Sequence, residues 1–231
     1  MPELYPARVL ESRPEAESQV LLTFEVPKEV WSEHIQPAQY VELVVGGLNP
    51  WQGTVANRPG RETFDFLVKD VGERSHRIAG LSEGDEVLVS RPRGPGFPVE
   101  AFRRYDVILM AAGVAICAMR AVIEEILLNR TEWGKVLVFY GERTADRFAF
   151  GQERERWRES GIEVHLSASR PAEGTYWRGH AGYVQEHILE VSPDLREAVV
   201  FAAGKDGMID GIRRVLGRLG LPPNRLLLNI D

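Results

Sequence analysis

One segment of the chain reads Tyr105-Asp-Val-Ile-Leu-Met-Ala-Ala-Gly-Val-Ala-Ile-Cys-Ala-Met-Arg120. Its apolar first half is typical of a buried strand, the small residues around Gly113 predict a turn, and a helix is expected to begin near Ile116. A strand, a tight turn and a helix in this order suit a dinucleotide, because backbone N–H groups at the helix N-terminus can meet its pyrophosphate. Alanines stand in the turn where close approach of a phosphate favours glycine.

Strands and helices alternate on the C-terminal side of this segment. We expect strands at 106–111, 135–140, 163–167, 198–203 and 226–229, and helices at 116–129, 152–160, 183–190 and 208–219. Such alternation predicts a parallel sheet buried between two layers of helices.

The chain has a different character before Phe102. Short alternating runs predict strands at 19–26, 40–45, 63–69 and 86–90, with one short helix at 75–81. Pro, Gly and Asn separate these runs at the spacings of an antiparallel sandwich or barrel. We therefore expect two domains, a β-barrel over 1–103 and an α/β domain over 104–231.

Composition excludes several classes of protein. The 231 residues are 44% apolar and 27% charged, as in ordinary globular proteins. No apolar run approaches the ~18 residues of a membrane span, and the first residues lack the pattern of a signal peptide, so neither is expected. The net charge of −6 argues against a nucleic-acid surface. The single cysteine, Cys117, leaves no disulfide framework or iron–sulfur cluster, so the cytoplasm is the expected compartment. No histidine cluster has metal-ligand spacing, and no metal site is expected.

Several short motifs follow one another along nearly the whole chain. They include Trp51-Gln-Gly-Thr54, Gly72-Glu-Arg-Ser75, Arg91-Pro-Arg-Gly-Pro-Gly-Phe97, Lys135-Val-Leu-Val-Phe-Tyr-Gly-Glu-Arg143 and Ala203-Gly-Lys-Asp-Gly-Met208. Together with Ala111–Arg120 they resemble the ferredoxin–NADP reductase superfamily, and within it the small stand-alone FAD/NAD-binding oxidoreductase proteins like the kiwi fruit protein. The resemblance implies an FAD-binding barrel followed by an NAD(P)-binding domain.

The resemblance implies flavin roles for residues of the barrel. Thr54 matches a hydroxyl residue that reaches the reactive edge of the flavin, whereas Trp51 and Gly53 stand where the family has arginine and tyrosine. Trp51 could offer a π face to the flavin or serve as an ordinary packed aromatic. The remaining implied FAD contacts are Val55, Ala56, Asn57, Gly72, Arg74 and Ser75. Gly72–Ser75 also suits a plain N-capped turn.

The same resemblance implies a nicotinamide nucleotide site in the second domain. Its implied contacts are Gly113, Val114, Arg120, Gly141, Arg143, Ser169, Arg170, Gly204, Lys205, Asp206 and Met208. Ser169 and Arg170 would favour the 2′-phosphate of NADP, although an exposed loop arginine is the more ordinary interpretation. Ala203 stands where many relatives carry a cysteine beside the nicotinamide.

The expected function is a flavin-dependent NAD(P)H oxidoreductase with FAD and either NAD or NADP as cofactors. It would pass electrons from the nicotinamide nucleotide through FAD to a protein or small-molecule acceptor. Ala112, Ala115, Ala118 and Ala203 depart from the family motifs, so a catalytically degenerate module that only binds nucleotide or regulates a partner is the alternative.

Overall fold

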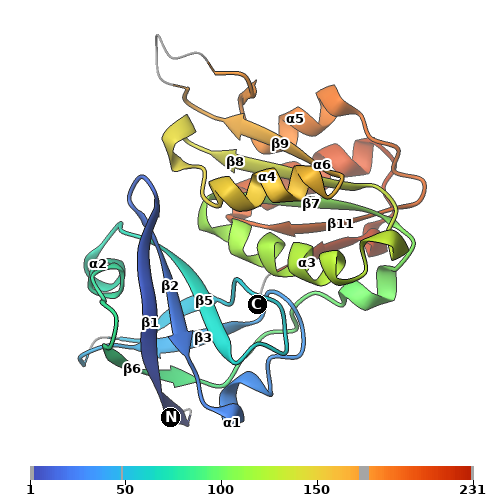
Figure 1. Ribbon diagram of the computed structural model, residues 1–231. Coiled ribbons are helices and arrows are strands. Elements are labelled where there is room, and N and C mark those ends of the chain that lie inside the picture. Colours follow the sequence, from blue (N-terminus) through green and yellow to red (C-terminus); the bar gives the residue numbers. More distant parts are fainter. Residues whose placement is uncertain (1–2, 48, 172–176, 230–231) are drawn as a thin grey trace.

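Two six-stranded sheets lie side by side in the molecule (Figure 1). The computed structural model describes residues 3–47, 49–171 and 177–229. The N-terminal sheet is antiparallel, and all six strands of the C-terminal sheet are parallel. The predicted fold class, a barrel followed by an α/β domain, is confirmed.

The N-terminal sheet has the strand order β4-β3-β6-β1-β2-β5. Its strands are β1 (Leu4–Ala16), β2 (Gln19–Glu25), β3 (Tyr40–Val44), β4 (Trp51–Thr54), β5 (Thr63–Lys69) and β6 (Glu86–Ser90). The end strands β4 and β5 come into contact, so the sheet curls into a barrel. Two short helices accompany it, α1 (Lys28–Trp31) and α2 (Glu73–Ala79).

The side chains of β5 point alternately into the barrel core and toward the second sheet. Phe64, Phe66 and Val68 are fully buried in the barrel core. Because successive side chains of a strand point to opposite faces, Leu67 and Lys69 point outward. Leu67 packs with residues of the second sheet in one core cluster, and this shared cluster joins the two halves of the molecule.

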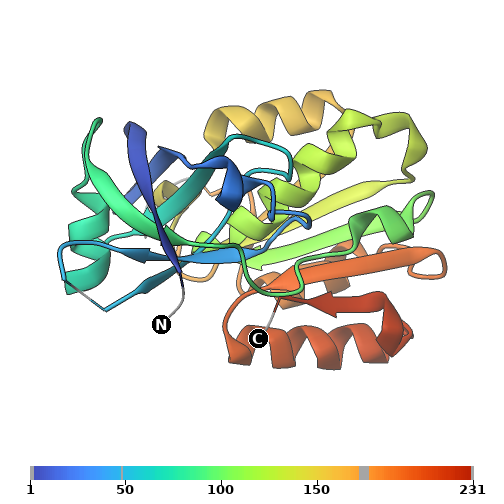
Figure 2. The ribbon, with the colours of Figure 1, turned by 90° about the horizontal axis from the view of Figure 1, so that it is seen from below.

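The C-terminal sheet has the order β10-β9-β8-β7-β11-β12. Its strands are β7 (Asp106–Ala112), β8 (Val136–Glu142), β9 (Ile162–Ala168), β10 (His180–Ala181), β11 (Ala198–Ala203) and β12 (Leu226–Leu228). The helices are α3 (Ile116–Leu128), α4 (Gly151–Glu159), α5 (Val184–Val191) and α6 (Asp206–Arg218). Helices α3 and α4 cover one face and α5 and α6 the other, as Figure 2 shows from below.

The strand order places a crevice at one end of this sheet. From β7 the chain builds outward to β8 and β9, and it then returns to add β11 on the opposite side of β7. The carboxyl ends of β7 and β11 therefore flank the point where the winding reverses, which is where open α/β sheets bind ligands.

Candidate functional site

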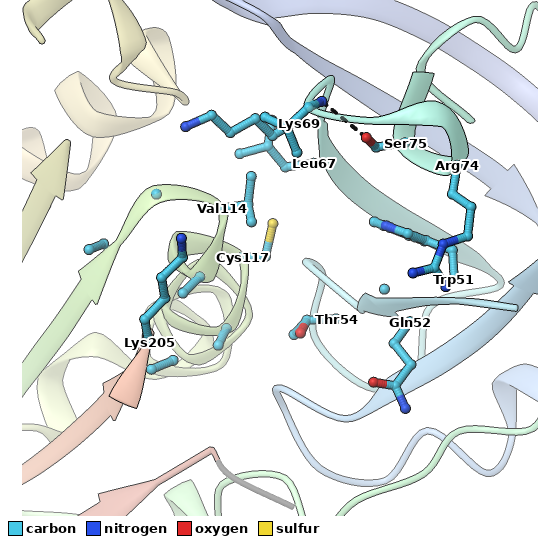
Figure 3. Close-up of a pocket in the computed structure, with 18 of the residues that line it drawn as sticks. Trp51, Gln52, Thr54, Leu67, Lys69, Arg74, Ser75, Val114, Cys117 and Lys205 are labelled. Carbon is cyan, nitrogen blue, oxygen red and sulfur yellow. Dashed lines mark hydrogen bonds between the residues drawn. The ribbon is translucent and has the colours of Figure 1, made fainter. Parts of the chain in front are cut away.

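A cleft of about 1000 Å³ opens between the two sheets (Figure 3). On the barrel side it is lined by β4, the end of β5 and the start of α2. On the other side stand the turn after β7, the start of α3 and the end of β11. Its volume is at the upper end of the range for small-molecule sites. The fold thus leaves room for a large ligand at the reversal of the sheet.

The charged side chains of the cleft are mainly basic, although the whole chain carries a net charge of −6. Among the described lining residues Lys69, Arg74 and Lys205 are basic, and Glu73 is acidic. Lys205 follows β11 and points into the cleft from the wall opposite Arg74 (Figure 3). Local excess of positive charge attracts anions such as phosphate groups.

Trp51 and Gly53 share one side of β4. A Cβ added at Gly53 would fall 2.3 Å from Cζ3 of Trp51, so the indole lies over the glycine. The edge of the indole also meets Phe66, with ring centroids 6.2 Å apart. Trp51 is partly buried and lines the cleft without closing it. Thr54, from the same strand, points into the cleft (Figure 3).

Ser75 lies at the cleft, but its hydroxyl is bonded within its own turn. The oxygen accepts a hydrogen bond from the N–H of Val71 at 3.0 Å and donates to the carbonyl of Gly72 at 3.0 Å. In this arrangement the hydroxyl proton of Ser75 is engaged by the carbonyl of Gly72, and the expected contact of Ser75 with a phosphate stays a prediction. Gly72 has nothing within 4 Å of the position of an added Cβ and borders open space.

Arg74 reaches from α2 toward β4. Its Nη1 donates to the carbonyl of Pro50 at 3.1 Å, next to Trp51. This places a guanidinium beside the strand position where the resemblance implied an arginine. The neighbouring Arg58 does not line the cleft; its Nη1 donates to Pro59 and its backbone N–H to Glu124.

The turn after β7 forms the floor of the cleft. Gly113 has φ of +62°, a left-handed conformation in which a side chain would be strained. Its added Cβ would also meet nothing within 4 Å, so the backbone here is open to a ligand. Ala112, Ala115 and Ala118 line the same cleft, and their methyl groups leave it open.

A second pocket of about 600 Å³ continues from the cleft over the carboxyl ends of β7, β8 and β9. The two cavities share Ala112, Gly113 and Lys205. Arg143 and Ser169 stand in its wall, and the exposed ring of Tyr183 borders it at the start of α5. A long ligand could therefore extend from one cavity into the other.

Glu142 at the end of β8 lines the second pocket while being 7% exposed. Burial raises the pKa of its carboxyl, and attraction to Lys69 opposes the rise. The carboxylate accepts hydrogen bonds from Gln19 Nε2 at 3.2 Å and from the hydroxyl of Tyr140 at 3.3 Å. Since Gln19 belongs to the barrel, Glu142 ties the pocket wall to the other domain.

Most residues expected at the site line one of the two cavities. The cleft is lined by Trp51, Thr54, Gly72, Arg74, Ser75, Gly113, Val114, Gly204 and Lys205, and the second pocket by Gly113, Gly141, Arg143, Ser169, Lys205 and Met208. Val55, Ala56, Asn57, Arg120, Arg170 and Asp206 line neither cavity.

The residues that lie elsewhere have identifiable reasons. Val55 and Ala56 are fully buried, and the side chain of Asn57 bonds to Thr63 and to the N–H of Asp65. Arg170 is exposed, and its N–H donates to Arg143. Asp206 is an exposed residue at the start of α6. Their expected cofactor contacts stay predictions.

The side chain of Arg120 links the α/β domain to the barrel, and its expected cofactor contact stays a prediction. Its side chain is 10% exposed and lies within 3.0 Å of Asp65 on β5 and 2.7 Å of Glu153 on α4. It also pairs with Glu124 and donates to the carbonyl of Ala56. Its place just after the ligand turn suggested a cofactor contact, but the helix turns this side chain toward the barrel.

Leu67, Lys69 and Tyr183 are among the lining residues that sequence reasoning missed. Leu67 and Lys69 line the cleft because they lie on the outward face of β5. The alternation along this strand predicts that position once its inward face is assigned. Tyr183 precedes α5 and lines the second pocket, although no cofactor contact was expected of it. In the described parts of the chain, no helix combines the length and apolarity needed to cross a membrane.

Comparison with known proteins places these features in context. Residues 109–214 match the family described as oxidoreductase NAD-binding domain. The chain is 26% identical to the sulfhydrogenase 1 subunit gamma of Pyrococcus furiosus, covering 99% of this chain and 80% of that protein. It is also 26% identical to the fruit protein pKIWI502 of Actinidia deliciosa, covering 97% and 75%.

A solved structure shares the fold over its full length. The chain superposes on a ferredoxin NADP⁺ reductase from Neisseria gonorrhoeae with bound FAD and NADP, with a TM-score of 0.82 and 14% identity. The match covers 99% of this chain and 98% of the reductase. At this identity the likeness concerns the fold, and both of the domains take part in it.

Proposed function

We propose that the chain passes electrons from NAD(P)H through FAD, as its resemblance to the ferredoxin–NADP reductase superfamily implies. FAD would occupy the cleft between the sheets, and the nicotinamide nucleotide would enter through the second pocket. The observation that carries the proposal is one open cavity system, basic at the barrel end and continuous with the crevice of the parallel sheet.

The cleft fits a flavin dinucleotide at its phosphate end. Gly72 leaves open space beside the start of α2, and Arg74 supplies a guanidinium next to β4. Such a group grips phosphate oxygens with paired donors. We propose that Arg74 and the backbone around Gly72 hold the pyrophosphate, with Lys69 adding positive charge.

The part of the cleft beside Trp51 also fits FAD, at the end that would hold the isoalloxazine. Although Gly53 replaces the tyrosine of the family, the indole of Trp51 covers the position where a side chain at residue 53 would begin. We propose that Trp51 supplies the aromatic surface for the isoalloxazine, so two departures from the motif compensate each other. Thr54 would offer its hydroxyl to the same ring system.

When bound, FAD supplies the ability to accept a hydride and to release electrons singly or in pairs. The residues of the chain bind and orient the reactants. Gly113, with its open left-handed backbone, admits the nicotinamide nucleotide at the start of α3, and Lys205 stands where both cavities meet. Ala203 offers only a methyl group, so no side-chain proton donor is present at that position. Arg143 and Ser169 would contact the adenosine half of the nucleotide.

The direct test is the absorbance spectrum of the purified protein. Flavin bands that bleach on addition of NADH or NADPH support the proposal, and comparison of the two nucleotides identifies the preferred one. Protein that is colourless and takes up no added FAD overturns it. Nucleotide binding without NAD(P)H oxidation would instead identify the chain as a degenerate binding module.

A matched pair of variants tests the phosphate site. Arg74→Gln removes the guanidinium beside β4, whereas Arg77→Gln changes an exposed arginine on the same helix that does not line the cleft. We expect Arg74→Gln alone to weaken FAD binding by at least about tenfold, because hydrogen bonds to charged groups contribute about 1.5–3 kcal/mol. Equal FAD affinities of the two variants would argue against this site.

A further inference from the structure

Three of the five histidines of the chain meet at one edge of the parallel sheet. They come from three elements: His165 from β9, His180 from β10 and His187 from α5. The rings of His180 and His187 are 4.7 Å apart between centroids, and those of His165 and His187 are 5.5 Å apart. Neither cavity is lined by these side chains, so the proposed redox site does not account for the cluster.

A carboxylate completes the cluster. Glu190 stands one helical turn after His187 on α5, and its Oε2 lies 3.0 Å from Nδ1 of His180. Residues three apart on a helix are neighbours on its surface. One potential ligand atom from each of His180, His187 and Glu190 can be chosen so that all three lie within 4.8 Å of one another.

A buried hydroxyl holds the ring of His187 from behind. Nδ1 of His187 lies 3.0 Å from Oγ of Ser167, which is fully buried on β9. In the tautomer that donates from Nδ1, the lone pair of Nε2 is left free. Metal-binding histidines are typically held in this way, with one ring nitrogen hydrogen-bonded and the other facing the ion.

Two ring nitrogens of the cluster, Nε2 of His165 and Nε2 of His180, make no hydrogen bond in the described structure. Nε2 of His180 is buried and makes no hydrogen bond, and the His180 side chain is only 10% exposed. An ion pair between His180 and Glu190 would satisfy Nδ1 alone. The cluster therefore contains more ring nitrogens than its own hydrogen bonds engage.

We propose that His180, His187 and Glu190 bind one divalent transition-metal ion. Two imidazoles and a carboxylate are a ligand set of zinc, with a fourth position left for water. Two ligand atoms that each lie about 2.1 Å from a tetrahedral ion are roughly 3.4 Å apart. Nδ1 of His180 and Oε2 of Glu190 are 3.0 Å apart, which is close to this separation. The 63% exposed side chain of Glu190 is free to rotate as the ion enters.

The ion would link the short strand β10 to α5, the helix that follows it after two residues. Strand β10 has two residues and pairs only with β9 among the described strands. The residues that follow it, Gly182 and Tyr183, form part of the wall of the second pocket. A metal that links β10 to α5 would therefore fix this wall, and its presence is independent of whether the protein carries a flavin.

The test uses untagged full-length protein, because a polyhistidine tag binds the same ions. After treatment with a chelator and desalting, Co²⁺ is titrated while the visible absorption of tetrahedral cobalt is followed, and Zn²⁺ is then added as a competitor. We expect about one equivalent of Co²⁺ to bind, Zn²⁺ to displace it and the thermal midpoint to rise with either ion.

Matched variants assign the ligands. His187→Gln and Glu190→Gln should each weaken Co²⁺ binding by more than about tenfold, and Ser167→Ala should weaken it by about tenfold or more through loss of the supporting hydrogen bond. His76→Gln, at an exposed histidine paired with Asp70 on the barrel, should bind as the unchanged protein does. Thermal unfolding in chelator establishes that each variant is folded. No cobalt spectrum, or equal affinity in His187→Gln and His76→Gln, overturns the proposal and leaves an ion pair.

Discussion

The guanidinium of Arg120 lies 3.0 Å from the carboxylate of Asp65, and this pair crosses from the helical layer of one domain to the barrel of the other. Glu124 and Glu153 face the same guanidinium, which is 10% exposed. One buried cation therefore faces three carboxylates at the domain junction. Removal of one partner of a buried pair is far more costly than the net contribution of the pair, since the other charges remain without compensation.

We therefore expect Arg120→Met to lower the free energy of unfolding by about 3–5 kcal/mol. Arg196→Met is the matched control, because Arg196 pairs with Asp194 in solvent with 88% of its side chain exposed. That change should cost less than about 1 kcal/mol. Urea denaturation of both variants measures the difference. Similar losses would show that the junction does not depend on Arg120.

The α/β domain was predicted well because its strands are buried on both faces. The strand Ala198–Ala203 was predicted with its observed bounds, since an unbroken apolar run between helices has few other interpretations. In contrast, β1 was not predicted, although it spans 13 residues. It contains Pro6 and Pro14, and only Ala7 and Val9 are buried, so its sequence lacks an apolar face. This segment forms a strand because neighbouring strands pair with it. The domain boundary near Phe102 stays a prediction.

The candidate site was predicted in part, and its failures have one physical origin. Motifs locate a turn or strand, but the direction of each side chain depends on packing partners distant in sequence. Arg120 follows the ligand turn and yet faces Asp65 of the barrel. Nothing in the sequence marks a partner for His180, whereas the fold brings Glu190 and His187 against it. Spacing alone does not show that an edge strand and a helix will meet.

The indole of Trp51 should affect flavin binding directly. Trp51→Ala removes the aromatic surface over Gly53, and we expect FAD affinity to fall about two- to tenfold, the usual range for one aromatic contact. Addition of FAD to flavin-free protein, followed by tryptophan emission, measures this affinity. Trp157→Phe is the control, because Trp157 is 3% exposed in the helical layer and does not line the cleft. If Trp51→Ala binds FAD as the unchanged protein does, the indole only packs the barrel.

Cys117 should be inert although it lines the cleft. Its side chain is 2% exposed, and burial raises the pKa of the thiol to about 12. Near pH 8 only on the order of one molecule in ten thousand would carry the reactive thiolate. Alkylation by a thiol reagent should therefore follow unfolding and accelerate in urea. Rapid labelling of the folded protein would show that the cleft exposes this residue.

The stability of the barrel should depend on the ionisation of His34. This side chain is 2% exposed, packs edge-on against Phe64 and has no hydrogen-bond partner for either ring nitrogen in the described structure. Burial lowers its pKa to about 4, from an ordinary value near 6.5. Between these values the unfolded chain binds a proton that the folded chain does not, so stability falls as the pH is lowered through this interval.

The expected loss attributable to His34 is about 2 kcal/mol between pH 7 and pH 5, and it approaches about 3 kcal/mol as the pH falls toward 4. His34→Leu removes the titrating group, whereas His76→Gln removes an exposed histidine that pairs with Asp70. Urea denaturation at a series of pH values separates the two, because carboxylates contribute equally to all three proteins. The stability curve of His34→Leu should be flatter than that of the unchanged protein in this interval, and the curve of His76→Gln should not be. Parallel curves for His34→Leu and the unchanged protein would mean that His34 gains a proton in the folded state as readily as in the unfolded one.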